Sequence, residues 1–137
     1  ILCIISSSKD NTYKWGGITA IGIGHPDAGT YYDDWDELVN GSNAGDGLCG
    51  FNDWRVPTVA ELSSIVNKGT VNPAIDTGYF PNTVPTWFWS SSPVANGPNY
   101  AWDVGFYGFY GFYGCYGSVV YYYRDDSGRV RLVRSGQ

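Results

Sequence analysis

Two segments of the chain carry hydrophobic and polar residues at helical spacing. Apolar residues recur every three or four positions behind Thr58 and Glu61, whose separation is that of a capping box. This pattern predicts a helix over residues 58–68, ended by a lysine and a glycine. Residues 33–39 begin with acids, which favour the first turn of a helix, and predict a second short helix that stops at Asn40-Gly41.

Three other segments have the composition or alternation of β-strands. Residues 86–90 are rich in aromatic side chains, residues 101–106 alternate large apolar residues with small or acidic ones, and residues 129–134 alternate arginine with apolar residues. Glycine- and proline-rich stretches separate these segments. The sequence therefore predicts an α+β domain, with two short helices packed on small antiparallel sheets and long loops.

Aromatic residues concentrate in residues 100–123, which hold twelve of the twenty-four in the chain. Within this segment Gly-Phe-Tyr occurs three times in succession, from Gly105 to Tyr113. A period of three matches neither a strand nor a helix, and a collagen helix is excluded because the repeat contains no proline. The strand patterns on both sides also disfavour a low-complexity, self-associating segment. Neither a regular strand nor a regular helix therefore explains the triplet repeat.

So many large rings cannot all lie in the core of a small domain, since each would bury about 150–250 Å². Tyrosine combined with Gly, Ser and Asn is typical of antibody paratopes, and exposed aromatic clusters mark partner sites. We therefore expect a ligand-binding surface in this part of the chain. Its predicted residues are Tyr100, Asp103, Gly105, Tyr107, Tyr110, Tyr113, Tyr116, Tyr121, Tyr123, Asp125 and Asp126.

Length and charge limit the classes of partner. The chain has 137 residues, the size of one domain, and a net charge of −5. Binding to polyanions relies on Lys and Arg, so nucleic acid and anionic membrane surfaces are disfavoured as partners. The one basic strip consists of Arg124, Arg129, Arg131 and Arg134. No apolar run approaches the ~20 residues that span a bilayer, so we expect no membrane insertion by this domain.

The sequence favours no catalytic site and no cofactor. His25 is the only histidine and lies in a His-Pro turn, far in sequence from Ser90–Ser92 and Cys115, so no nucleophile has an evident base. There is no Cys-x-x-Cys pair for zinc. Asp125 and Asp126 could supply oxygen ligands to Ca²⁺, but the chain contains no complete ligand loop, so no metal is predicted.

Three cysteines allow one disulfide and one free thiol if the protein is extracellular. Because Cys115 lies inside the aromatic repeat, Cys3 and Cys49 are the expected pair.

Several motifs in order along the chain resemble the Lcl C-terminal domain family. The most specific are Asp53-Trp54-Arg55-Val56-Pro57-Thr58 and Trp89-Ser90-Ser91-Ser92-Pro93, and the match continues to Val130-Arg131-Leu132-Val133-Arg134. The resemblance implies a C-type-lectin-like fold on an exported or cell-surface protein. It also gives Cys3 the role of a family cysteine that is missing before the first helix.

The resemblance implies roles for particular residues. Trp54, Arg55, Trp87, Trp89 and Trp102 would pack or brace the scaffold. Some members of the family are variable proteins of diversity-generating retroelements, in which mutagenesis of adenines turns AAC codons into other codons ending in C. Such codons never give Lys, Glu, Gln, Met or Trp, and residues 90–136 contain none of these except the motif residue Trp102.

The expected organisation is a single C-type-lectin-like domain over residues 1–137. Residues 1–89 would form the scaffold, and residues 90–137 a variable-like region that includes a closing strand at 129–134. The domain would be extracellular, cell-surface exposed or carried on a phage particle, with any signal or anchor outside this chain.

The expected function is non-enzymatic recognition of a protein or cell-surface ligand by a Tyr/Gly-rich, diversified surface. An alternative is an adhesin module that binds glycans or glycosaminoglycans, for which only the strip from Arg124 to Arg134 offers a basic face. An enzyme of the formylglycine-generating type is a third class. It is disfavoured because no cysteine pair is placed for that chemistry.

Overall fold

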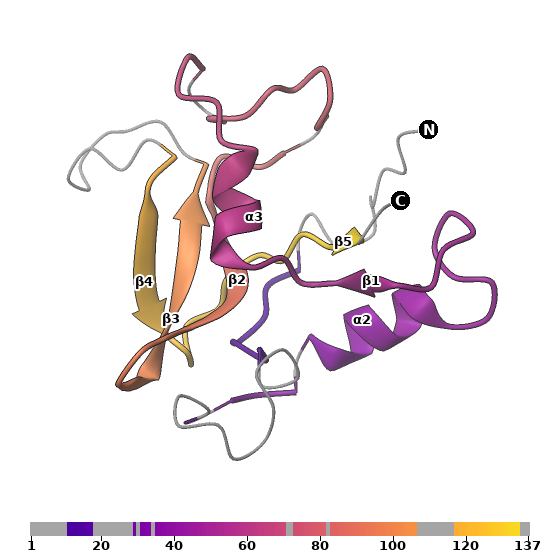
Figure 1. The fold of residues 1–137 in the computed structure, drawn as a ribbon, viewed down its shortest axis with the longest axis horizontal. Helices are drawn as coiled ribbons and strands as arrows, with labels where there is room; N and C mark the ends of the chain where they lie inside the picture. The colour runs from indigo at the N-terminus through magenta and orange to yellow at the C-terminus, as the bar shows by residue number, and fades with distance from the viewer. Residues whose placement is uncertain are drawn as a thin grey trace.

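A computed structural model of the chain describes residues 11–17, 29, 31–33, 35–70, 73–81, 83–106 and 117–134. The elements are, in order, α2 (Asp36–Asn43), β1 (Trp54–Arg55), α3 (Val59–Ser64), β2 (Trp87–Val94), β3 (Gly97–Gly105), β4 (Val119–Tyr123) and β5 (Val133–Arg134). Strands β2, β3 and β4 form one antiparallel sheet, and β1 pairs with β5 in another. Helix α3 lies over the larger sheet, and α2 lies beside β1 (Figure 1). The predicted α+β class, with two short helices and small antiparallel sheets, is confirmed.

The register of the larger sheet assigns each side chain of β3 to one of two faces. Val104 lies opposite Phe88 on β2 and Val119 on β4, whereas Asp103 lies opposite Trp89 and Val120. Because side chains of a strand alternate between faces, even-numbered and odd-numbered residues of β3 meet different surroundings.

The odd-numbered face of β3 packs on a core built largely from tryptophan. Half-buried Trp87 and Tyr122 pack against this core, and their rings stack with centroids 4.7 Å apart. The indole N–H groups find backbone acceptors, as buried tryptophans require: Trp15 donates to the carbonyl of Ser90 over 2.9 Å, and Trp89 to that of Tyr13 over 2.8 Å. The buried residues of this core are Trp15, Trp35, Trp54, Val56, Trp89, Ala101, Val130 and Leu132.

The even-numbered face of β3 packs under α3 in a second core. Leu62 of α3, Ile75 and Phe106 surround Val104 and Phe88, and the two phenylalanine rings meet edge to face with centroids 5.4 Å apart. The sheet is therefore held from both sides over this part of its length.

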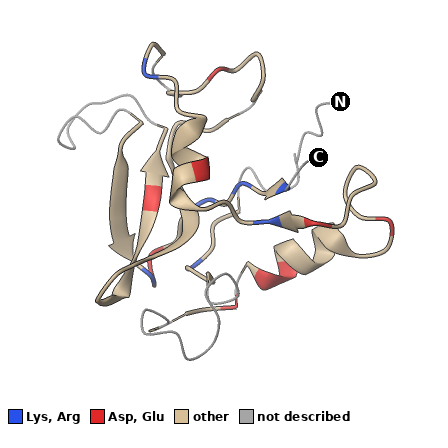
Figure 2. Cartoon of the chain, in the orientation of Figure 1, with Lys and Arg blue, Asp and Glu red and all other residues tan. Residues whose placement is uncertain are grey.

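The family-like motifs brace the elements against one another. The capping box at Thr58 and Glu61 is confirmed, and the Glu61 carboxylate also accepts two hydrogen bonds from Arg55 of β1, at 2.7 and 2.6 Å. The blue segment of β1 and the red segment of α3 mark this pair in Figure 2. Ser91 donates to the carbonyl of Pro57, and the Ser92 hydroxyl accepts the backbone N–H of Val59, so β2 is fastened to the start of α3.

Both helices end at positions other than those predicted. Helix α2 continues through Asn40-Gly41 to Asn43, because the Asn43 side chain accepts from the backbone N–H of Trp54 at 2.7 Å and donates to its carbonyl at 2.8 Å. Helix α3 ends at Ser64 rather than near residue 68.

The strands also differ in length from the prediction. Strand β2 continues to Val94, with register shifts around Pro93, whose missing N–H suits such an irregularity. The predicted closing strand 129–134 is regular only at Val133–Arg134, which pairs with β1. Strand β4 was not predicted, although a run of two valines and three tyrosines is typical of a strand.

Cys49 is disulfide-bonded. The other two cysteines of the chain lie outside the described residues, so the pairing of Cys3 with Cys49 stays a prediction. None of the helices in the described ranges has the length and apolar character of a membrane span.

We expect Glu61→Gln to destabilise the protein by about 1 kcal/mol at neutral pH, because it removes an ion pair that is well aligned but more than a third exposed. The hydrogen bonds from Arg55 and Thr58 lower the pKa of Glu61 from 4.5 to about 2. The stabilisation is therefore present above pH 4.5 and is lost as the pH falls from there toward 2. Urea unfolding at neutral pH and near pH 2 measures it, with Glu37→Gln in the exposed first turn of α2 as the control. An equal loss at both pH values would contradict the assignment.

Candidate ligand-binding surface

Four aromatic side chains lie together on the even-numbered face of β3 and its partner positions on β4. Tyr100 lies opposite Tyr123 and Trp102 opposite Tyr121 in the register of the two strands. Ring centroids are 4.7 Å apart for Tyr100 and Tyr123, 5.3 Å for Tyr100 and Tyr121, and 5.6 Å for Trp102 and Tyr121. We call Tyr100, Trp102, Tyr121 and Tyr123 the aromatic face.

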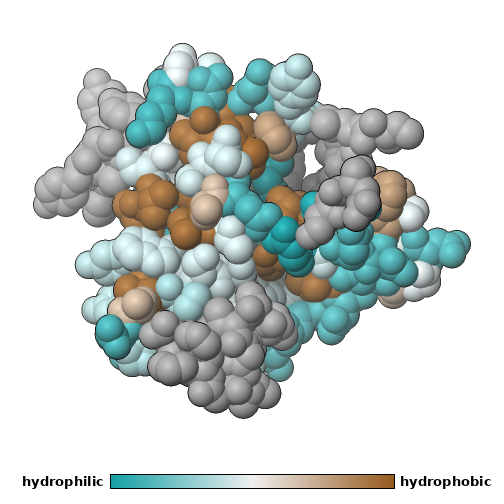
Figure 3. Space-filling model, viewed as in Figure 1, coloured by the Kyte–Doolittle hydropathy of each residue, from teal (hydrophilic) through white to brown (hydrophobic). Residues whose placement is uncertain are grey.

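The aromatic face remains open because the second core lies farther along the sheet, around Val104. The side chains of Tyr121 and Tyr123 are 54% and 53% exposed, and Tyr100 and Trp102 are half-buried. In Figure 3, pale residues of intermediate hydropathy cover the region of β3 and β4 away from the loop after α3. The three predicted site tyrosines in these strands are therefore brought into one surface.

Tyr122 shows that strand register, not composition, decides which tyrosines are displayed. It lies between Tyr121 and Tyr123 but points to the other face of β4, where its ring stacks on Trp87. Trp102, to which the family resemblance gives a scaffold role, is half-buried and its ring meets that of Tyr121 edge to face. Its two-residue spacing from Tyr100 was the signal in the sequence.

The aromatic face offers ring faces and hydroxyl groups. A hydrogen bond with the Tyr123 side chain, followed by desolvation, raises the pKa of Tyr100, so its phenol stays neutral at physiological pH. The surface can therefore form aromatic contacts and neutral hydrogen bonds with a ligand.

The prediction that Asp103 and Gly105 belong to the displayed surface is wrong. Both lie on the odd-numbered face of β3, and Asp103 is 0% exposed. Neither carboxyl oxygen of Asp103 has a hydrogen-bond partner. Desolvation raises the pKa of this side chain from 3.8 to about 8, so it is largely a neutral acid within the fold at physiological pH.

The other predicted site residues divide into two groups. Asp125 is exposed and Asp126 is half-buried in the turn after β4, where the Asp126 N–H donates to the carbonyl of Tyr123 at 3.0 Å. They lie directly beyond the end of the aromatic face. Tyr107, Tyr110, Tyr113 and Tyr116 lie outside the described residues.

The basic strip predicted from the sequence is not a displayed face. The Arg124 side chain is buried, donates to the Tyr100 carbonyl and lies 4.2 Å from the Trp15 ring. The Arg131 side chain donates to Thr83 and lies against two phenylalanine rings, and desolvation lowers its pKa. Arg134 pairs with Asp53 at 3.0 Å. Arg124 and Arg131 are therefore used inside the fold, and the Arg134 guanidinium is occupied by a partly exposed ion pair.

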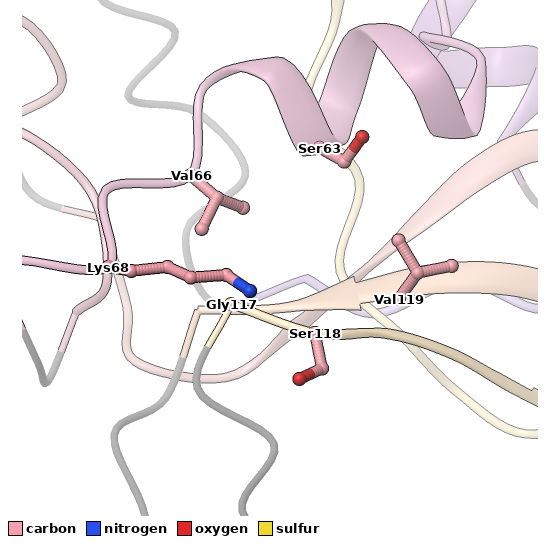
Figure 4. Close-up of a pocket in the computed structure, with 6 residues that line it drawn as sticks. All are labelled: Ser63, Val66, Lys68, Gly117, Ser118 and Val119. Carbon is pink, nitrogen blue, oxygen red and sulfur yellow. The ribbon is translucent and has the colours of Figure 1, made fainter.

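An open pocket of about 660 Å³ lies between the end of α3 and the start of β4. The Lys68 side chain extends toward Gly117, with Val66 on one side and Ser118 on the other (Figure 4). Ser63 and Val119 complete its described lining. Gly117 has φ 57°, and a Cβ on it would clash with a methyl group of Val66, so the backbone here requires glycine. None of the four residues of the aromatic face belongs to the described lining of this pocket.

Among the described residues, no group of three His, Cys, Asp or Glu side chains is placed to hold a metal ion. Asp125 and Asp126 thus have no third acidic or histidine ligand in that part of the chain.

The family model of the Lcl C-terminal domain matches residues 7–134. No curated protein and no solved structure matches the chain.

We expect Asp103→Asn to remove a pH dependence of stability. Because the pKa of Asp103 is raised, the unfolded chain releases this proton near pH 4 while the folded chain keeps it to about pH 8. Between these values the wild type should lose about 1.4 kcal/mol of unfolding free energy per pH unit relative to the variant. Urea unfolding at several pH values from 4 to 8 measures the difference. Parallel stability profiles for the two proteins would show that Asp103 is ionised in the folded state.

Proposed function

Because the chain belongs to the Lcl C-terminal domain family, we propose that it is a non-enzymatic binding domain that recognises a protein or cell-surface ligand through its aromatic face. One observation carries this proposal. Four adjoining aromatic side chains lie on one sheet surface, two of them more than half exposed, although the same segment supplies other rings to the core. Exposed aromatic clusters of this kind mark partner sites.

The mechanism we propose is recognition by rigid aromatic anchors. Tyrosine and tryptophan offer large contact areas for the loss of only two side-chain torsions, and such residues dominate binding energy in interfaces. Cross-strand pairing of Tyr100 with Tyr123 and of Trp102 with Tyr121 already restrains the rings. Little conformational entropy is then lost when a ligand binds.

We propose further that the fold is C-type-lectin-like. The domain would be exposed outside a cell or on a phage particle. The family match and the arrangement of two short helices with small antiparallel sheets support it. The disulfide at Cys49 supports an oxidising location, because structural disulfides persist there.

A glycosaminoglycan-binding adhesin is less favoured by the geometry. That alternative depended on a basic face at residues 124–134, and the guanidinium groups of Arg124, Arg131 and Arg134 are occupied within the fold. Neutral glycans do not need such a face and are one outcome of the binding test below.

We further propose that the surface is diversified by a retroelement. The displayed positions 121 and 123 hold tyrosine, which AAC-derived codons ending in C encode, whereas the neighbouring frame residues Val104 and Phe106 are buried. Variation at such positions would change the ligand contacts and leave the cores intact.

Diversification predicts the codon usage of the gene. Codons for Tyr, Gly and Phe in residues 94–128 should nearly all end in C, and a near-copy of this stretch carrying AAC should lie nearby. Sequencing the locus checks both. Random third bases, or the lack of a copy, would contradict retroelement diversification and leave the binding function to be judged separately.

We expect Tyr121→Ala with Tyr123→Ala to abolish face-dependent binding and change the unfolding free energy by less than about 1 kcal/mol, since both rings are about half exposed. An unbiased random-peptide display library selected on the wild type, then depleted on this double variant, should leave binders specific for the aromatic face. A glycan array serves as the second ligand set.

Tyr79→Ala is the matched control, because Tyr79 is 68% exposed and lies in the loop between α3 and β2. The control should bind every selected ligand as the wild type does. Two results would refute the proposed function: no ligand that distinguishes the wild type from the double variant, or a large stability loss that places the two rings in a core.

A further inference from the structure

We propose that the aromatic face recognises cationic side chains, arginine above all, presented by an exposed segment of a partner protein. This inference rests on the proposed function and names the chemistry of the ligand. It is carried by the ring geometry of the aromatic face, by the absence of basic residues from its two strands and by the acids at its edge.

The aromatic face presents ring faces to which a cation can bind. The face of an aromatic ring is electron-rich and attracts Arg or Lys placed within about 6 Å of its centroid. This fold uses that contact repeatedly: the Arg134 guanidinium lies 3.7 Å from the Phe51 ring centroid, and the Lys14 ammonium lies 4.9 Å from that of Tyr32. Within the described part of the chain, no cation lies over a ring of the aromatic face. An external cation would thus meet no competing cation from the described residues.

The charged residues on and next to the two strands favour a cationic ligand. Strands β3 and β4 contain no Lys or Arg, and Figure 2 shows no blue segment on either. The nearest arginine in sequence, Arg124, is 1% exposed and lies against Trp15 on the opposite face of the sheet. Asp125 and Asp126 come after Tyr123 and the buried Arg124, and Asp125 is exposed. A basic segment would meet ring faces along the strands and carboxylates at their end.

The net charge of the whole chain also favours a cationic ligand. With a net charge of −5, the chain attracts cationic partners and repels anionic ones over a distance set by the salt concentration. Arginine is favoured over lysine, because its planar guanidinium stacks on a ring and also donates several hydrogen bonds. Those bonds suit the hydroxyl groups of Tyr121 and Tyr123 and the carboxylate of Asp125.

The test uses three peptides of equal length, built on Arg-Gly-Ser, Glu-Gly-Ser and Gln-Gly-Ser repeats, titrated into the whole domain by calorimetry. The Arg peptide should bind, and the Glu and Gln peptides should not. Its affinity should fall between about 0.01 M and about 0.1 M salt, over which the Debye length shortens from about 30 Å to about 10 Å.

Amino-acid substitutions test whether binding requires the aromatic ring faces or only an apolar surface. Tyr121→Leu with Tyr123→Leu keeps an apolar surface and removes both ring faces, and should weaken the Arg peptide about tenfold. Tyr79→Leu, at an exposed ring outside the aromatic face, should have no effect. Asp125→Asn should weaken binding about threefold at low salt, and more than Asp46→Asn, which makes the same change of net charge in the loop after α2.

The inference is overturned if the Glu or Gln peptide binds as well as the Arg peptide, if the leucine variant binds unchanged, or if none of the peptides binds. These failures are separable from failure of the proposed function. Face-dependent ligands from the unbiased library that lack Arg and Lys, or neutral glycans from the array, would sustain the binding domain and refute the cationic ligand. No face-dependent ligand at all would refute both.

Discussion

Backbone hydrogen bonds hold β3 between β2 and β4, and this central strand buries side chains on both of its faces. Ala101 belongs to the tryptophan core on one side, and Val104 to the core beneath α3 on the other. Because the side-chain period of a strand is two, a slip of one residue would exchange these faces along the whole strand. The two cores therefore fix the register, and the register fixes which rings face outward. The aromatic face depends on packing that it does not itself provide.

The aromatic side chains that the structure describes fall into two populations with different physical roles. Tryptophans 15, 35, 54 and 89 are buried together and direct their indole N–H groups to backbone carbonyls, or pack on neighbouring rings. The tyrosines of β4 divide by position: Tyr122 is packed on the core, and Tyr121 and Tyr123 are displayed. Four of the five arginines interact with other described side chains or carbonyls. Arg124 and Arg131 do so inside the fold, and Arg55 and Arg134 form ion pairs that are partly exposed.

Local signals in the sequence predicted the class of the fold and several of its contacts. The capping box at Thr58 and Glu61 needs only neighbouring residues, so it could be found by inspection. The end of α2 at Asn43 could not, because the interaction that extends it is made with Trp54 in another element. The display of Tyr121 and Tyr123 was predicted from composition, but the burial of Tyr122 and Asp103 was not, because both depend on how β3 and β4 pair, and β4 was not predicted. Aspartate is rarely buried without a partner, so the sequence alone offered no reason to expect the Asp103 carboxyl group inside an apolar core.

The alternation along β4 has a consequence for how this protein tolerates sequence change. Three adjacent tyrosines are chemically identical, yet the middle one packs against the tryptophan core and the outer two are exposed. Mutational drift in a population of such domains would therefore be permitted at every second position of this strand and purged at the position between. Core packing and surface composition can therefore change separately within five consecutive residues, because the pleat of the strand places the packed and the exposed side chains on opposite faces.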